Sequence, residues 1–254
     1  MKVSIDAVSI PPLGSQLVIV SDAHLGAAPA DSEEALFAFL ERVPALGDCL
    51  LLNGDLFDFW FAYRQVIPRR GFALAAALAT LRRRVPIVMT GGNHDRWGGS
   101  FWEEELGIPF SGESLRFGLG DRTVLAIHGD GLTEQHLGAK VVHRLTRNRL
   151  VLGAFRLIPP DLSFGLVDRM SGHLADSTRD AAVLDRAADA QRTWAEATLG
   201  ADPSLGLVVM GHTHRPALTE PFPGRCYCNP GAWMNGLHFA VATPQAVTLH
   251  TFAP

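Results

Sequence analysis

Five short segments of the chain combine residue types that bind divalent cations and transfer protons. They are Asp22-Ala23-His24, Gly54-Asp55-Leu56-Phe57-Asp58, Gly92-Asn93-His94-Asp95, His128-Gly129 and Gly211-His212-Thr213-His214. Carboxylate and amide oxygens together with neutral imidazoles suit manganese, iron or zinc. Two such cations about 3.5–4 Å apart can activate a shared water near neutral pH. The segments therefore predict a dinuclear metal site with hydrolytic chemistry.

Each segment follows an apolar run that predicts a short buried strand. The runs are Leu17–Val20, Cys49–Leu52, Ile87–Thr90, Val124–Ile127 and Leu207–Met210. Continuous apolar runs are typical of strands that are buried on both faces. Because open α/β sheets bind ligands at the carboxyl ends of their strands, we expect the five segments to meet at one edge. A single Asp-x-His is more often a turn, so the prediction depends on all five segments together.

Helices and hairpins complete the predicted fold. Apolar residues at helical spacing predict one helix through Leu36 and Val43, with a possible capping box of Asp31 and Glu34, and another through Leu74, Leu78 and Leu81. Residues 114–128 and 238–251 predict hairpins. Parallel strands followed by hairpins favour two mixed sheets packed face to face with helices outside.

Residues 132–200 interrupt the alternation of strands and helices. They contain no strand signal, and two apolar stripes predict helices, one through Leu137, Val141 and Leu145 and one from Leu184 to Trp194. The sequence therefore predicts a single domain over residues 1–254, with a helical insertion at about 132–200.

The composition excludes several classes of protein. Hydrophobic residues make up 47% and charged residues 19%, which is typical of a globular domain. A net charge of −4 does not favour tight nucleic-acid binding. Three cysteines do not predict a disulfide framework. Without a secretory leader pattern or a spanning apolar stretch, we expect a cytoplasmic protein or one on a membrane surface.

The five segments, in this order, resemble the signature of the calcineurin-like metallophosphoesterases between residues 17 and about 235. The resemblance implies an αββα four-layer sandwich of two mixed sheets. It also implies that a metal-bridging hydroxide attacks phosphorus, while His94 protonates or stabilises the leaving oxygen and Asp58 orients His94. The implied ligands are Asp22, His24 and His214 for the first metal, Asn93, His128 and His212 for the second, and Asp55 between them.

Residues 54–61, with Tyr63-Arg64 and Ile67–Arg70, resemble the UDP-2,3-diacylglucosamine hydrolases of lipid A synthesis. That resemblance implies manganese, the release of UMP from a lipid-linked nucleotide sugar, and association with the inner face of the cytoplasmic membrane. The stretch from Lys140 to Arg156 is basic, apolar and free of acidic residues, which favours a lid or a membrane contact over an ordinary helical hairpin. The predicted substrate contacts are Arg64, Arg144 and Arg149.

Two other functions compete with this interpretation. Arginine stands at the position of His94 in the well-known members of that group, so a phosphodiesterase acting on cyclic nucleotides or nucleic acid is the alternative. Five aromatic residues of the chain could stack bases, belong to the core or contact acyl chains: Phe59, Trp60, Phe61, Trp97 and Trp102. A non-catalytic binding module is disfavoured because every expected ligand is present.

Overall fold

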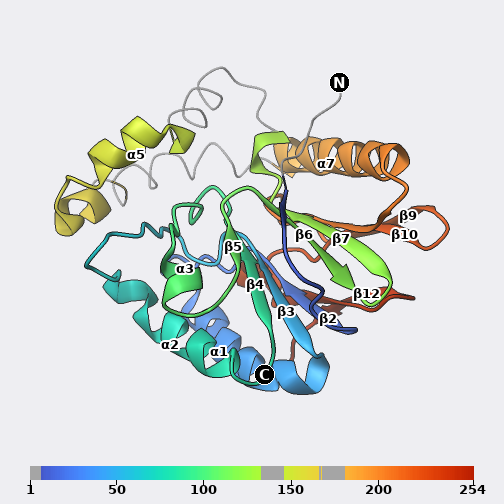
Figure 1. Cartoon of the computed structure of the whole chain (residues 1–254), viewed down its shortest axis with the longest axis horizontal. Coiled ribbons are helices and arrows are strands. Elements are labelled where there is room, and N and C mark those ends of the chain that lie inside the picture. The colour runs from blue at the N-terminus through green and yellow to red at the C-terminus, as the bar shows by residue number, and fades with distance from the viewer. Residues whose placement is uncertain (1–6, 133–145, 166, 168–180) are drawn as a thin grey trace.

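Strand β2, Leu17–Val20, is buried along its whole length and faces two apolar cores. Leu17 and Ile19 belong to one core, while Val18 and Val20 belong to another. Side chains alternate across a strand, so a continuous apolar run requires packing on both faces of the sheet. The computed structural model describes residues 7–132, 146–165, 167 and 181–254, which form four layers around these cores (Figure 1).

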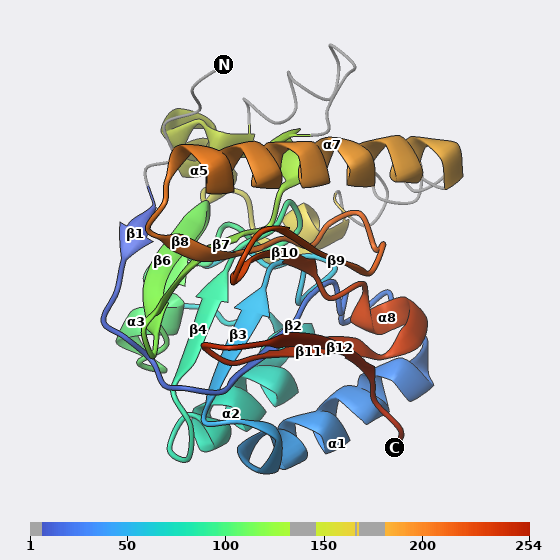
Figure 2. The ribbon, with the colours of Figure 1, turned by 90° about the vertical axis from the view of Figure 1, so that its right-hand side faces the viewer.

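The first mixed sheet has the strand order β12-β11-β2-β3-β4-β5. The chain runs parallel from β2 to β5, and β11 pairs antiparallel with both β2 and β12. Helices cover its outer face (Figure 2). The elements are β3 (Cys49–Asn53), β4 (Ile87–Thr90), β5 (Phe110–Ser111), β11 (His238–Ala242), β12 (Val247–Thr251), α1 (Ala30–Leu46), η1 (Arg69–Gly71), α2 (Phe72–Leu81), α3 (Phe101–Glu104) and α8 (Trp233–Gly236).

The second mixed sheet has the order β1-β6-β7-β8-β10-β9 and packs on the first. Its strands are β1 (Val8–Ser9), β6 (Ser114–Leu119), β7 (Arg122–Ile127), β8 (Leu205–Val209), β9 (Ala217–Phe222) and β10 (Arg225–Asn229). Helix α7, Ala181–Ala201, lies over its outer face, where Ala195 and Leu199 pack against Val208 and Tyr227 (Figure 2). The αββα sandwich of two mixed sheets is therefore confirmed.

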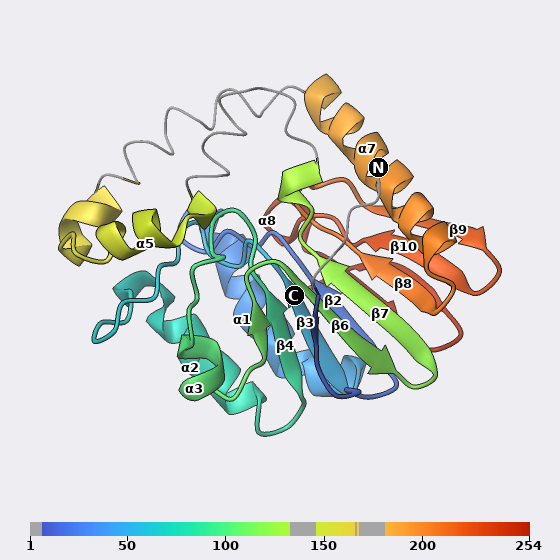
Figure 3. The same ribbon diagram turned by 45° about the horizontal axis from the view of Figure 1, so that its top comes forward.

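The predicted insertion lies between β7 and β8, which are neighbouring parallel strands. Its described residues include the short helix η2 (Asp130–Leu132), α5 (Arg149–Phe155) and α7, with no strand among them. Helix α7 contains the predicted stripe from Leu184 to Trp194, whereas the helix predicted through Leu137 and Leu145 lies outside the described residues. Figure 3 shows α5 and α7 at opposite sides of the molecule. No described helix is long and apolar enough to cross a membrane.

Two local features differ from the sequence prediction. The capping box is wrong, because α1 begins at Ala30 and the Asp31 carboxylate accepts from the adjacent Ser32 amide inside the first turn. The strand β9 was not predicted. It contains Pro221 and alternates between half-buried and exposed side chains, which an edge strand tolerates.

Candidate metal site

The loops that follow β2, β3 and β8 hold their polar residues in an unusual backbone conformation. Among the described residues, six non-glycine residues have positive φ, and all but Leu237 are predicted ligands. These five are Asp22 (54°), His24 (46°), Asp55 (51°), His212 (70°) and His214 (57°). Left-handed backbone costs on the order of 1–3 kcal/mol per residue and persists where the surroundings impose it, often at functional sites. The backbone strain therefore coincides with the predicted ligands.

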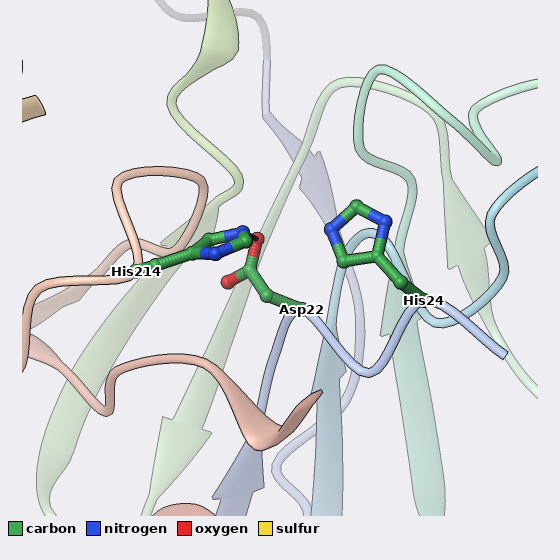
Figure 4. A group of neighbouring side chains, drawn as sticks. All are labelled: Asp22, His24 and His214. Atoms are coloured by element: carbon green, nitrogen blue, oxygen red, sulfur yellow. Dashed lines mark ion pairs between the residues drawn. The ribbon is translucent and has the colours of Figure 1, made fainter. Parts of the chain in front are cut away.

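Asp22, His24 and His214 form a first group of converging side chains (Figure 4). One nitrogen or oxygen atom from each lies within 4.8 Å of the others. His214 Nε2 is 3.4 Å from Asp22 Oδ1, and Asp22 is fully buried. The loops after β2 and β8 thus bring together the three residues predicted for the first metal.

Asp55, His128 and His212 form a second group, and one ligand atom from each again lies within 4.8 Å of the others. Asp55 Oδ2 lies 3.0 Å from His128 Nε2 in this group and 3.8 Å from His24 Nε2 in the first. Asp55 is therefore placed between the two groups, where a shared ligand would be required. Its other oxygen accepts from the His94 backbone N–H at 2.9 Å.

Hydrogen bonds to the backbone orient the site's histidine rings and carboxylates. His128 Nδ1 donates to the Asn53 carbonyl at 2.9 Å, which leaves Nε2 facing Asp55. Asp22 accepts from the His212 backbone N–H at 3.0 Å with both carboxylate oxygens. Such supporting bonds fix which ring nitrogen of a metal-binding histidine is free to bind.

Burial and mutual charge shift the pKa values of the group. Burial lowers the pKa of His24 to about 4, so its ring is neutral, the form that binds metals. Burial opposes charge on Asp22, but His214 and His128 outweigh it and lower the Asp22 pKa to about 2. Burial also opposes charge on His128, but Asp55 outweighs it and raises the His128 pKa to about 10. A cation that binds there must displace that proton.

The donor atoms themselves fit a pair of cations. His24 Nε2 and Asn93 Oδ1 are buried without a hydrogen-bond partner among the described residues. Buried polar atoms are nearly always satisfied, so orphaned lone pairs at two predicted ligands call for a partner such as a metal. The donor set of carboxylate, imidazole and amide, without thiolate, agrees with manganese, iron or zinc.

Asp58 meets His94 through both its backbone and its side chain. Its Nδ1 donates to the Asp58 backbone carbonyl at 2.6 Å, whereas the Asp58 carboxylate lies 3.7 Å away. The ring packs edge-on against His24, with centroids 4.8 Å apart. Burial lowers the pKa of His94, but Asp55 and Asp58 outweigh it and raise the pKa. Residue 58 thus orients His94 mainly through its backbone, so Asp58→Asn should preserve this contact.

Asp95 stabilises the loop beside the ligands. Its fully buried carboxylate accepts from the backbone N–H groups of Gly92 (2.8 Å), Asp55 (3.2 Å) and Leu56 (2.7 Å). It therefore joins the loops that carry Asp55 and Asn93. A β-carbon at position 92 would lie 2.1 Å from Asp55 Oδ1, so only glycine permits this approach.

Arg96 and Asp130 form a buried ion pair that sequence reasoning missed. Their side chains are 4% and 6% exposed, and Arg96 Nη2 donates to Asp130 Oδ2. Arg147, from the insertion, lies 3.6 Å from Asp130 and donates to Glu113 at 2.8 Å. The segments around His94 and His128 are thereby joined to the insertion, and Arg147 in the basic stretch has acidic partners within the fold.

Replacing Arg96 by methionine is expected to lower the free energy of unfolding by about 3 kcal/mol. The Asp130 carboxylate would stay buried, and its charge would lose the Arg96 guanidinium that balances it. Urea denaturation measures this loss. Arg116→Met is the control, since the Arg116–Asp202 pair is 33% and 38% exposed and should contribute at most about 1 kcal/mol. Equal losses in the two variants would contradict the role given to Arg96.

Of the three predicted substrate contacts, Arg64 is exposed on the loop after β3. Arg144 lies outside the described residues, and Arg149 is the first residue of α5. These three assignments stay predictions. Instead, Arg69 and Arg70 line a cavity of about 290 Å³ together with Tyr63, Val66, Ile67, Pro68, Pro160, Asp161 and Phe164. A second, smaller pocket shares Arg70 and Phe164 with this cavity and is also lined by Asp58.

Sequence comparison finds relatives that are named as hydrolases. A UDP-2,3-diacylglucosamine hydrolase from Porphyromonas gingivalis is 32% identical over 60% of this chain and 60% of that protein. The enzyme of the same name from Aeromonas salmonicida is 30% identical over 80% of this chain and 79% of its own length. Among solved structures, a dimetal phosphatase from Danio rerio has a TM-score of 0.47 at 12% identity, covering 95% of this chain and 100% of that chain.

The profile of the calcineurin-like phosphoesterase family matches residues 15–216. That range contains all five segments and both ligand groups. The chain is therefore a metal-dependent hydrolase and belongs to the calcineurin-like phosphoesterase family.

Proposed function

We propose that this hydrolase cleaves the pyrophosphate of a nucleotide-sugar lipid of the UDP-2,3-diacylglucosamine type and releases UMP. The observation that carries the reaction class is the presence of two ligand groups that are linked by Asp55, which belongs to the second group and lies close to His24 of the first. The printed names of the relatives and an apolar cavity beside the site support the substrate class.

In this proposal, seven residues bind the two cations and His94 donates a proton. Asp22, His24 and His214 hold one cation, Asn93, His128 and His212 hold the other, and Asp55 is shared. Two divalent cations, for which we propose Mn²⁺, supply Lewis-acid polarisation of phosphoryl oxygens and lower the pKa of the attacking water. His94, fixed through Nδ1 by the Asp58 carbonyl, presents Nε2 to the leaving oxygen as a proton donor.

The cavity of about 290 Å³ accommodates an acyl chain in this proposal. Its walls include Val66, Ile67 and Phe164, and each methylene buried there would contribute roughly 0.8 kcal/mol. Arg69 and Arg70 line the same cavity and suit the phosphate groups of such a substrate. Phe164 comes from the insertion and packs on Phe59, 4.9 Å between centroids, so the insertion would close over the bound chain.

Introducing a charge into the cavity tests the acyl site. Ile67 is 46% exposed, so Ile67→Asp should fold normally. We expect it to raise KM for the diacylated substrate by about tenfold or more, because a carboxylate opposes burial of the acyl chain. Turnover of bis(p-nitrophenyl) phosphate should not change. Leu249→Asp, on the edge strand β12, is the matched control, and an equal change in KM in both variants would contradict the assignment.

We also propose peripheral contact with an anionic membrane surface. Exposed apolar side chains near the cavity and on the insertion include Phe72 (62%), Leu150 (83%), Leu157 (85%) and Leu162 (66%). Basic residues interleave with them in the sequence, a combination that favours anionic lipid surfaces. We expect the protein to sediment with phosphatidylglycerol vesicles and much less with phosphatidylcholine vesicles. Equal sedimentation with both, or with neither, would contradict an electrostatic membrane contact.

The alternative of a nuclease has less support. Of the aromatic residues that could have stacked bases, Trp60, Phe61 and Trp102 are buried in the fold. Phe59 packs on the insertion, and Trp97 Nε1 donates to the Thr146 carbonyl at 2.8 Å. The proposal is tested by incubating the Mn²⁺-loaded protein with UDP-2,3-diacylglucosamine, a cyclic nucleotide and single-stranded DNA. Release of UMP with little turnover of the others is expected, and preferential cleavage of either alternative would overturn it.

A further inference from the structure

Gln191 is a buried polar residue in the otherwise apolar face of α7. That face contains Ala195 and Leu199, and all three residues are fully buried. An amide buried without hydrogen bonds would cost several kcal/mol, so its retention here depends on its partners.

All partners of the Gln191 amide lie in or beside the metal-site loops. Nε2 donates to the carbonyls of Gly211 at 3.2 Å and Gly129 at 3.4 Å. Oε1 accepts from Thr213 Oγ1 and Asn229 Nδ2, both at 3.4 Å. A glutamine amide has two donor hydrogens and a two-acceptor oxygen, so these four contacts use its whole capacity.

The two carbonyls flank the second ligand group directly. Gly129 follows His128, and Gly211 precedes His212. The Gly211 N–H also donates to the His128 carbonyl at 3.0 Å, and the Gly211 carbonyl accepts from Asn229 Nδ2 at 3.0 Å. Loop 128–129 and loop 211–213 thus share one direct backbone hydrogen bond, and Gln191 adds a contact to each loop. Gly129 has φ +98°, and a β-carbon there would lie 2.4 Å from Gln191 Nε2, so the contact is closely fitted.

We propose that Gln191 is a positioning residue for the second metal ion: through its two carbonyl contacts, α7 sets the spacing between His128 and His212. The inference rests on the proposed assignment of these histidines as ligands. It means that the last helix of the insertion takes part in forming the metal site as well as covering the sheet.

Two variants separate this role from general packing. Gln191→Met keeps the length of the side chain and removes all four hydrogen bonds. Gln191→Glu keeps the size and both acceptor contacts but loses the donors to Gly129 and Gly211. Leu199→Ala is the control. Leu199 lies on the same helix about two turns after Gln191, so its replacement weakens the packing of α7 without touching the ligand loops.

Calorimetric titration of the metal-free full-length protein with Mn²⁺ is the measurement. The wild type should bind two ions, and both Gln191 variants should weaken one binding step about ten- to a hundredfold while leaving the other unchanged. Activity of these variants should recover as the Mn²⁺ concentration rises, and Leu199→Ala should match the wild type. If the Gln191 variants bind Mn²⁺ as Leu199→Ala does, the inference is overturned. A wild type that binds no Mn²⁺ would instead remove the proposed function.

Discussion

Replacing Asp55 by asparagine is expected to reduce turnover of every phosphodiester substrate by about 10³-fold or more. Asp55 lies between the two ligand groups and supplies the charge that both require. Electrostatic activation by a metal pair contributes several kcal/mol, and each 1.4 kcal/mol corresponds to tenfold in rate. Asparagine has the same shape as aspartate but carries no charge. Its side-chain oxygen can still accept the hydrogen bond from the His94 backbone N–H, so the variant should keep that contact.

The measurement is turnover of bis(p-nitrophenyl) phosphate at saturating Mn²⁺, with circular dichroism to establish that the variant is folded. Asp48→Asn is the control. Asp48 accepts hydrogen bonds from the backbone N–H groups of Ser15 and Gln16, which precede β2, whereas the ligand loop follows its other end. Replacing Asp48 should therefore leave turnover unchanged. A folded Asp55→Asn protein that retains wild-type turnover would remove the dinuclear mechanism.

The second large effect is expected at His94 and should depend on the leaving group. His94→Ala is expected to slow hydrolysis of an ester with a poor leaving group by about 10²–10³-fold, because general acid catalysis typically contributes that much. A p-nitrophenolate leaving group needs no proton, so the same variant should lose far less activity on bis(p-nitrophenyl) phosphate.

This role is tested by measuring kcat for both classes of ester in three proteins: the wild type, His94→Ala and His250→Ala. His250 is exposed on β12, away from the site, and its replacement should have no effect on either ester. Equal loss on both esters in His94→Ala would mean that His94 supports the site without donating a proton.

The five ligand-bearing segments and the two mixed sheets could be predicted from sequence because each depends on a local pattern. The division of the ligands between two metals came from the family resemblance. The continuous apolar run of β2 requires a core on each face of its sheet. Polar residues directly after β2 and β3 in the first sheet, and after β8 in the second, lie at the carboxyl ends of their strands, where such folds bind ligands. The hairpin of β6 and β7 followed from two short runs around Gly118–Asp121 in the same way.

The contacts that support the site could not be predicted, because they join residues far apart in the chain. Gln191 looked like a member of an amphipathic stripe, and nothing local identifies the carbonyls 20 and 62 residues away that it meets. Arg147 belonged to a basic stretch, and its pairing with Glu113 depends on how the insertion folds back. For His94, the family resemblance implied orientation by Asp58, and nothing local shows that the Asp58 carbonyl lies closer to the ring than the Asp58 carboxylate does.

Anomalous diffraction from crystals of the Mn²⁺-loaded protein tests the central claim most directly. We expect two peaks: one beside Asp22, His24 and His214, the other beside Asn93, His128 and His212, with Asp55 reaching both. A single peak, or peaks elsewhere in the molecule, would contradict the dinuclear site.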